Sequence, residues 1–128
     1  MNPVLLCLGG ATAAAWGVAH LIPTTKVAAG FGPISDDNRH IITMEWIAEG
    51  ALLLFAGTVV ILVAAVDYHS AAAGAASVAT AITLIAMAIV SVFTGFKVKF
   101  LPFRLCPAIF TISPGSHPGR NLLIRRTR

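Results

Sequence analysis

Charge is the scarcest property of this sequence. Asp, Glu, Lys and Arg make up 11% of the 128 residues, 57% are hydrophobic, and the mean hydropathy is +0.86. Soluble domains carry about 25% charged residues, so an ordinary soluble domain is excluded. Three apolar runs are each long enough to cross a bilayer, which takes about 20 residues. Because these runs are continuous and do not alternate, a membrane β-barrel is not expected.

Cysteines and catalytic motifs are also scarce. The two cysteines, Cys7 and Cys106, lie far apart in the chain, so neither a redox motif nor a disulfide framework is predicted. The sequence contains no phosphate-binding loop, nucleophile elbow or zinc-protease helix. The first basic residue is Lys26, so the apolar N-terminus lacks the basic region of a cleaved signal peptide. These absences favour a protein that is not an enzyme.

The apolar runs predict an all-α integral membrane protein with a single domain, residues 1–113. Full transmembrane helices are expected at about 3–22, 41–66 and 71–96, and a short, incomplete fourth segment at 105–113. Proline and glycine signals mark the segment 24–39 as a loop or a short interfacial element. The polar side chains Ser35, Asp36 and Asp37 suit the N-terminus of the second helix. Residues 67–70 are expected to form a tight polar turn.

The basic residues predict the orientation in the membrane. Lys26 and Arg39 lie in the first connection, and Lys97, Lys99 and Arg104 lie in the third. The positive-inside rule then places both connections in the cytoplasm and the N-terminus outside, in the inner (plasma) membrane. The net charge of +4 is therefore explained by topology, and no nucleic-acid partner is expected.

The C-terminal residues 114–128 differ in character from the rest of the chain. They are rich in Pro, Gly, Ser and Arg, which predicts a basic, disordered cytoplasmic tail. Arg125 and Arg126, with the basic residues of the third connection, are expected to contact lipid headgroups or only to enforce topology. The abrupt change of composition also suggests, as a hypothesis, a truncated or frame-shifted end.

Glu45 and Glu49 are the most informative residues. They lie one turn apart on one face of the second span, where a carboxylate in hydrocarbon is costly. The predicted topology brings His20 and Arg39 to the same depth. Glu49 is the deeper of the two, so it is expected to be more dehydrated and to hold a proton at neutral pH. Glu45, nearer the interface, can reach water or Arg39.

Several interpretations of this polar group stay open. The glutamates could relay protons, form a pocket for a quinone headgroup or another small molecule with His20, or only pair with basic neighbours and fix helix packing. No cofactor is evident, although a quinone would suit the pocket. Metal binding is not predicted, because no ligand repeat such as Glu-x-x-His is present. The histidine alone is weak evidence, since such residues often lie at helix ends.

Short motifs in four places resemble the DoxX-like family of small four-helix bacterial membrane proteins. The first span ends in Gly17-Val-Ala-His-Leu, the second carries Glu49-Gly50, the third carries 84–88 (Leu-Ile-Ala-Met-Ala), and a fourth segment begins near Leu101-Pro102. The resemblance implies a four-helix bundle and, for some members, a link to quinone-related redox complexes. Only Glu49, with Gly50, carries over as a candidate position. Glu45 and the short fourth segment depart from the family pattern.

Three functions are therefore carried forward. The first is a non-catalytic accessory or interaction subunit, packed on itself as a homo-oligomer or on a partner within a membrane complex. The second is a redox-linked component that binds a quinone or lipid-like molecule near Glu49. The third is a proton-coupled carrier. The small residues of 71–81 are expected to allow close helix packing, either within the chain or between copies.

Overall fold

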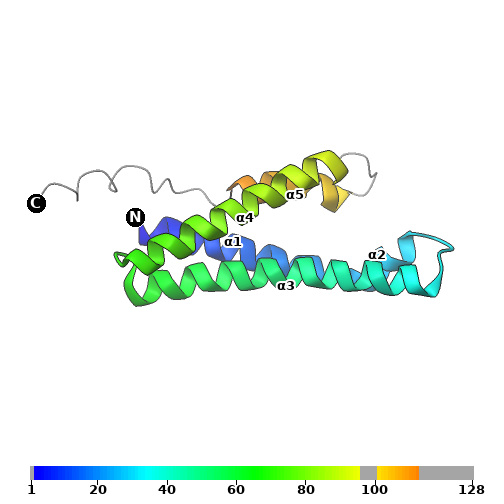
Figure 1. Cartoon of the computed structure of the whole chain (residues 1–128), viewed down its shortest axis with the longest axis horizontal. Helices are drawn as coiled ribbons and strands as arrows, with labels where there is room; N and C mark the ends of the chain where they lie inside the picture. Colours follow the sequence, from blue (N-terminus) through cyan, green and yellow to red (C-terminus); the bar gives the residue numbers. More distant parts are fainter. Residues whose placement is uncertain (1, 96–100, 113–128) are drawn as a thin grey trace, which may run out of the picture.

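The computed structural model of the protein describes residues 2–95 and 101–112, and the side chains within 2–93 and 105–112. Its described residues form five helices: α1 (Pro3–Leu21), α2 (Thr24–Gly30), α3 (Asp36–Asp67), α4 (Ala71–Gly95) and α5 (Leu101–Ile112) (Figure 1). Three of them, α1, α3 and α4, are long and apolar enough to cross a membrane. The predicted all-α membrane fold, with a short additional segment, is thus confirmed. Lys97, Lys99, the tail 114–128 with Arg125 and Arg126, and the side chain of Arg104 lie outside the described part.

The polar residues before the second span begin its helix, as predicted. Ser35 is the N-cap of α3, and its hydroxyl accepts a hydrogen bond from the Asn38 amide at 3.3 Å. Asp36 and Asp37 occupy the first turn, where their carboxylates favour the positive end of the helix dipole. The helix therefore starts before the apolar run that begins at Ile41, because capping rather than hydropathy fixes its first turn.

The two connections that the structure describes differ from each other. The segment after Pro23, expected to be a loop or a short interfacial element, contains the seven-residue helix α2. At the other end of the bundle, Ser70 accepts a hydrogen bond from the Ala73 amide at 3.1 Å and so begins α4. The Asp67 carboxylate accepts one from the His69 amide at 3.0 Å. The tight polar turn expected between the second and third spans is confirmed.

Glycines bring α1 and α3 into close contact, and the two helices lie side by side (Figure 1). Gly10 and Gly17 on α1 face Gly57 and Gly50 on α3, each pair at heptad spacing. A Cβ added at Gly17 would lie 2.6 Å from the Leu54 backbone nitrogen, and one at Gly10 would lie 2.8 Å from the Gly57 carbonyl oxygen. Backbone atoms therefore occupy the space that any side chain would need, and small residues are the means by which helices approach closely in lipid.

The small residues at the start of α4 do not make the corresponding contact within the chain. Ala73 is buried, but Ala71, Ala72 and Ala75 are exposed. A Cβ added at Gly74 would meet no atom within 4 Å. The helix packs mainly against α5. Close backbone packing in this bundle thus belongs to α1 and α3 and not to the alanine-rich segment.

The main core is shared by four helices. It consists of one residue from α1, one from α3, two from α4 and two from α5: Ala13, Leu53, Leu84, Ala88, Cys106 and Phe110. Helix α5 has 12 residues and is about 18 Å long, whereas the hydrocarbon of a bilayer is about 30 Å thick. It begins at Leu101, earlier than the predicted 105, since Pro102 is tolerated within a first turn. The fourth segment is therefore a short, packed member of the bundle.

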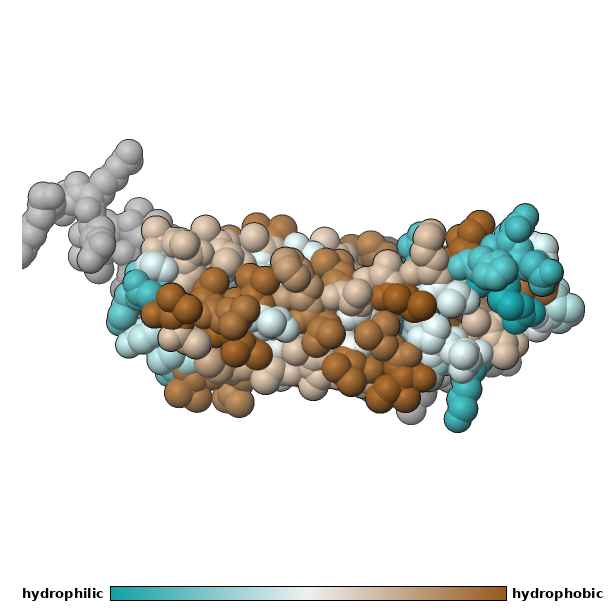
Figure 2. Space-filling model, turned by 90° about the horizontal axis from the view of Figure 1, so that it is seen from below, coloured by the Kyte–Doolittle hydropathy of each residue, from teal (hydrophilic) through white to brown (hydrophobic). Residues whose placement is uncertain are grey.

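Large hydrophobic side chains cover much of the exterior. Phe55, Leu62, Val66 and Phe93 each expose more than half of their surface. Figure 2 shows hydrophobic residues over the middle of one face and hydrophilic residues gathered at its two ends. A soluble protein rarely exposes apolar surface on this scale, whereas a bilayer accepts it at no cost. This distribution agrees with a bundle embedded in lipid.

Candidate polar site between four helices

His20 is buried inside the bundle. It lies in the last turn of α1, and only 5% of its surface is exposed. The other buried residues that the structure describes in the core are hydrophobic. Its ring stacks on the Trp46 indole of α3, with centroids 3.8 Å apart and planes 15° apart. The Trp46 indole nitrogen donates a hydrogen bond to the His20 backbone carbonyl at 2.7 Å. Two contacts from one tryptophan therefore fix both the backbone and the ring of this histidine.

The hydrogen bond of Trp46 is expected to contribute measurably to stability. The His20 carbonyl lies in the last turn of α1, where no further helical amide can reach it. Trp46→Phe keeps an aromatic ring for stacking and removes the donor, so we expect a loss of about 1 kcal/mol in the free energy of unfolding. This loss is measured by unfolding the protein with SDS in detergent micelles and following the helix content by circular dichroism. Trp16→Phe is the matched control, because the buried Trp16 indole nitrogen has no hydrogen-bond partner. Equal losses in the two variants would contradict the assignment.

Glu49 meets His20 across the interface between α1 and α3. Its Oε2 lies 3.5 Å from His20 Nε2, and the two side chains are 26% and 3% exposed. At this distance His20 Nε2 makes no hydrogen bond and remains a buried polar atom without a partner. Glu49 is thus positioned to exchange a proton with the histidine or to share a third ligand with it. The sequence placed these residues at one depth, and the structure shows that they face each other.

Cys106 completes the group from a third helix. His20, Glu49 and Cys106 each offer one ligand atom, and these atoms all lie within 4.8 Å of one another. The thiol is buried in the main core, against which the Trp16 side chain also packs. An imidazole, a carboxylate and a thiol therefore converge from α1, α3 and α5 in an otherwise apolar core.

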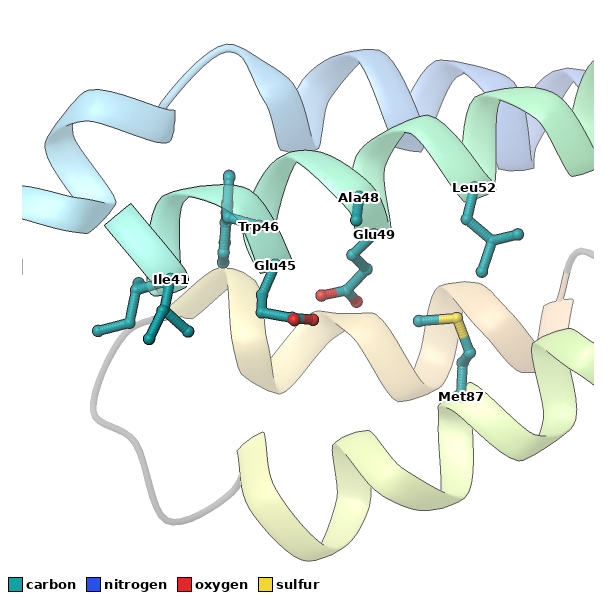
Figure 3. Close-up of a pocket in the computed structure, with 8 residues that line it drawn as sticks. Ile41, Glu45, Trp46, Ala48, Glu49, Leu52 and Met87 are labelled. Atoms are coloured by element: carbon teal, nitrogen blue, oxygen red, sulfur yellow. The ribbon is translucent and has the colours of Figure 1, made fainter. Parts of the chain in front are cut away.

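A cleft opens beside these residues on the side of α4. It has a volume of about 500 Å³ and is lined by α3 and by Met87 of α4. Figure 3 shows the carboxylates of Glu45 and Glu49 directed into it from α3, with the Met87 sulfur approaching from the opposite wall. A second hollow, of about 300 Å³, adjoins it, shares Glu49 and Met87, and reaches Cys106. The polar group thus lies at the inner side of an apolar cleft.

The two glutamates have different surroundings. Glu45 is exposed and lies nearer the start of α3, whereas Glu49 is half-buried and lines both hollows. Helical geometry explains this difference. The buried side of α3 runs through Trp46, Gly50 and Leu53, and Glu49 is next to that side while Glu45 is further around. Glu49 is therefore the residue that connects the cleft to His20.

Arg39 does not join this site. Its guanidinium donates hydrogen bonds to the carbonyl oxygens of Ala28, at 3.1 Å, and Gly32, at 3.2 Å. The side chain thus fastens α2 and the following loop to the start of α3. Among the described residues, the basic side chain that lies within 4 Å of a glutamate carboxylate is His20, beside Glu49. Arg39 therefore has a structural role at the end of the bundle.

Sequence reasoning did not identify several residues at this site. Cys106 was considered only for a disulfide or a redox motif, and neither Met87 nor Trp46 was assigned to the site. No local pattern reveals the cysteine, because its neighbours in the site lie on other helices. The position of Trp46 was detectable in principle, since it begins the same helical face as Gly50 and Gly57.

Comparisons with protein-family models, with curated proteins and with solved structures find no match to this chain. Any inference about what the site binds therefore depends on the geometry of the site itself.

Proposed function

We propose that this chain is a non-catalytic multi-pass membrane protein that holds a quinone or similar amphiphilic molecule in the cleft beside Glu49. One observation carries the proposal: a cleft of about 500 Å³ receives two carboxylates from α3 and has otherwise mainly apolar walls. Volumes of about 300–1,000 Å³ are typical of small-molecule sites, which combine apolar walls with a few placed polar groups. Such a cleft suits a polar head attached to an apolar tail.

The cleft offers separate places for the two parts of such a molecule. A quinone carbonyl is a hydrogen-bond acceptor, so a protonated Glu49 donates a hydrogen bond to it. The ring of His20 lies behind this carboxyl group, with Nε2 3.5 Å from Oε2. Met87 faces the carboxylates from α4, where its sulfur can contact a flat ring. Ile41 and Leu52 supply apolar surface for a tail. The exposed side of the cleft would then be completed by lipid.

The proposal includes an orientation and a family. Lys26 and Arg39 lie at the end of the bundle that holds the α2–α3 loop, and by the positive-inside rule this end is cytoplasmic. The cleft then lies toward the cytoplasmic half of a bacterial inner membrane, with the N-terminus outside. A DoxX-like affiliation, proposed from Gly17-Val-Ala-His20 and Glu49-Gly50, is compatible with the contact between His20 and Glu49.

Binding of a short-chain quinone tests the proposal. The protein in lipid nanodiscs is titrated with the quinone, and binding is followed by quenching of Trp46 and Trp16 fluorescence. Glu49→Leu keeps a side chain of similar size but removes the hydrogen-bond donor, so we expect about tenfold weaker binding, the equivalent of one lost hydrogen bond. Asp67→Asn, at the far end of α3 and exposed, is the matched control and should bind as the wild type does.

The same preparations separate the alternative functions. Quinone binding no stronger than that of empty nanodiscs, together with stoichiometric co-purification of another membrane subunit, would favour an accessory or interaction subunit. Proton flux in liposomes that is lost in Glu49→Gln would favour a proton-coupled carrier. Quinone extracted from the native protein in stoichiometric amount would support the cleft as its binding site.

A further inference from the structure

We propose that His20, Glu49 and Cys106 bind a divalent transition metal ion of the zinc type. The inference goes beyond the proposed function, since it requires no quinone in the cleft and concerns the ionised form of Glu49, whereas the quinone contact uses the protonated form. It starts from the convergence of three ligand atoms, one from each of three helices, all within 4.8 Å of one another. One imidazole nitrogen, one carboxylate oxygen and one thiolate sulfur are the three donor types that zinc accepts in proteins.

The distances between the three ligand atoms are close to those between atoms that share a metal ion. Zinc binds nitrogen and oxygen at about 2.0–2.2 Å and sulfur at about 2.3 Å, so the edges of its tetrahedron are about 3.3–3.7 Å long. His20 Nε2 and Glu49 Oε2 are already 3.5 Å apart. The sulfur lies no more than 4.8 Å from the other two ligand atoms, so it needs to approach them by about 1 Å to complete the coordination.

An unpartnered buried atom points independently to a ligand. The His20 side chain is 3% exposed, and its Nε2 has no hydrogen-bond partner although it faces Glu49. A buried polar atom without a partner costs about 1–3 kcal/mol, and a metal ion would relieve that cost. Trp46 stacks on the ring and so holds it in the orientation that directs Nε2 at Glu49.

Charge balance favours a divalent ion at this depth. A zinc ion carries two positive charges, and a Glu49 carboxylate with a Cys106 thiolate carries two negative charges, so the loaded site has no net charge. A neutral site avoids the large cost of an isolated charge in an apolar core. A monovalent copper ion would leave one negative charge and would meet a carboxylate, a hard ligand that it does not prefer.

The neighbouring hollows supply a route to the ion and a fourth position. Glu45 lies at the exposed side of the cleft and Glu49 at its inner side, so a cation passes one carboxylate before it reaches the three ligands. The second hollow contains both Glu49 and Cys106 in its lining. Zinc sites that bind exchangeable ligands use this arrangement: three ligands come from the protein, and the fourth position is open to water or a small molecule.

Metal content and cobalt spectroscopy test this inference on the full chain. The protein is purified in mild detergent without chelator, its metals are measured by mass spectrometry, and apoprotein is titrated with Co²⁺ and with Zn²⁺ alone. We expect one zinc ion per chain, together with a cobalt–thiolate charge-transfer band and the visible bands of tetrahedral cobalt. Cys106→Ser should abolish the charge-transfer band and weaken zinc binding by more than about 100-fold, and Glu49→Gln should weaken it by at least about tenfold.

The second cysteine provides the matched control. Cys7 lies near the other end of α1, so Cys7→Ser should keep the zinc ion and the band unchanged. X-ray absorption of the zinc-loaded wild type should show one sulfur and three nitrogen or oxygen ligands, the third of these from water, and it decides the matter if Cys106→Ser fails to fold. Wild-type apoprotein that gives no cobalt–thiolate band, or a zinc ion without sulfur, overturns the inference. A metal-free protein that still binds quinone would overturn the metal site alone.

Discussion

Gly57→Ala will destabilise the bundle, although alanine is the better helix former. The added Cβ would lie 2.5 Å from the Ala14 backbone nitrogen and 2.9 Å from the Ala14 Cβ, and it would overlap the Gly10 carbonyl. All of these atoms are fixed by α1, so the helices must separate. Overpacking of this kind costs about 1–3 kcal/mol, and we expect a loss of that size in the free energy of unfolding, measured with SDS in detergent micelles.

Gly74→Ala is the matched control, since it makes the same chemical change on α4. The new Cβ meets no atom within 4 Å. Only helix propensity then acts, and we expect a gain of up to about 1 kcal/mol. The two variants should therefore shift stability in opposite directions. A Gly57→Ala variant as stable as Gly74→Ala would show that α1 and α3 do not approach as closely as the structure indicates.

Phe110→Ala is expected to have a comparable or larger effect, because it removes the largest fully buried side chain of the core. Phe110 is 1% exposed. It extends from α5 into the main core, which also holds residues of α1, α3 and α4. Truncation of a buried phenylalanine costs about 3–5 kcal/mol in water-soluble proteins. In lipid the transfer term is small and the cavity term remains, so we expect about 3 kcal/mol. SDS unfolding of the variant measures this loss.

Ile112→Ala on the same helix provides the comparison. Ile112 is 67% exposed, so its truncation leaves no cavity, and we expect a change within about 0.5 kcal/mol. Limited proteolysis adds a local measurement: α5 should become sensitive to cleavage in Phe110→Ala and stay protected in Ile112→Ala. Equal stability of the two variants would mean that α5 lies outside the bundle.

Hydropathy and capping predicted most of the fold. Three long apolar runs are sufficient to predict three spanning helices, since few other structures can satisfy the backbone in lipid. Ser35 and the acidic residues after it predicted where α3 begins. The helical state of residues 24–30 was not predicted, because Pro23 and the glycines that follow are equally compatible with a loop. The apolar pattern placed the start of α5 at 105, because Arg104 interrupts the pattern, whereas the short motif Leu101-Pro102 marked the start that the structure has.

The candidate site could be predicted only in part. The cost of a carboxylate in an apolar span identified Glu49, and the depth of the two helix ends suggested His20 as its neighbour. The role of Arg39 could not be predicted in this way, because charge attraction alone does not show that the carbonyls of Ala28 in α2 and Gly32 in the following loop lie closer to its guanidinium. The position of Cys106 beside Glu49 could not be predicted either, because it depends on how α5 packs.

The sequence by itself determined the lipid environment of this protein and its three long helices. Hydropathy, helix caps and breakers act through neighbouring residues, so they can be interpreted along the chain. Only the tertiary structure decided which helix faces touch: Gly57 against α1, Cys106 beside Glu49, and the cleft between α3 and Met87. The physical reason is that lipid solvates every apolar face equally well, so hydrophobicity does not select the inner one. Shape and the few buried polar groups make that selection, and both depend on residues distant in sequence.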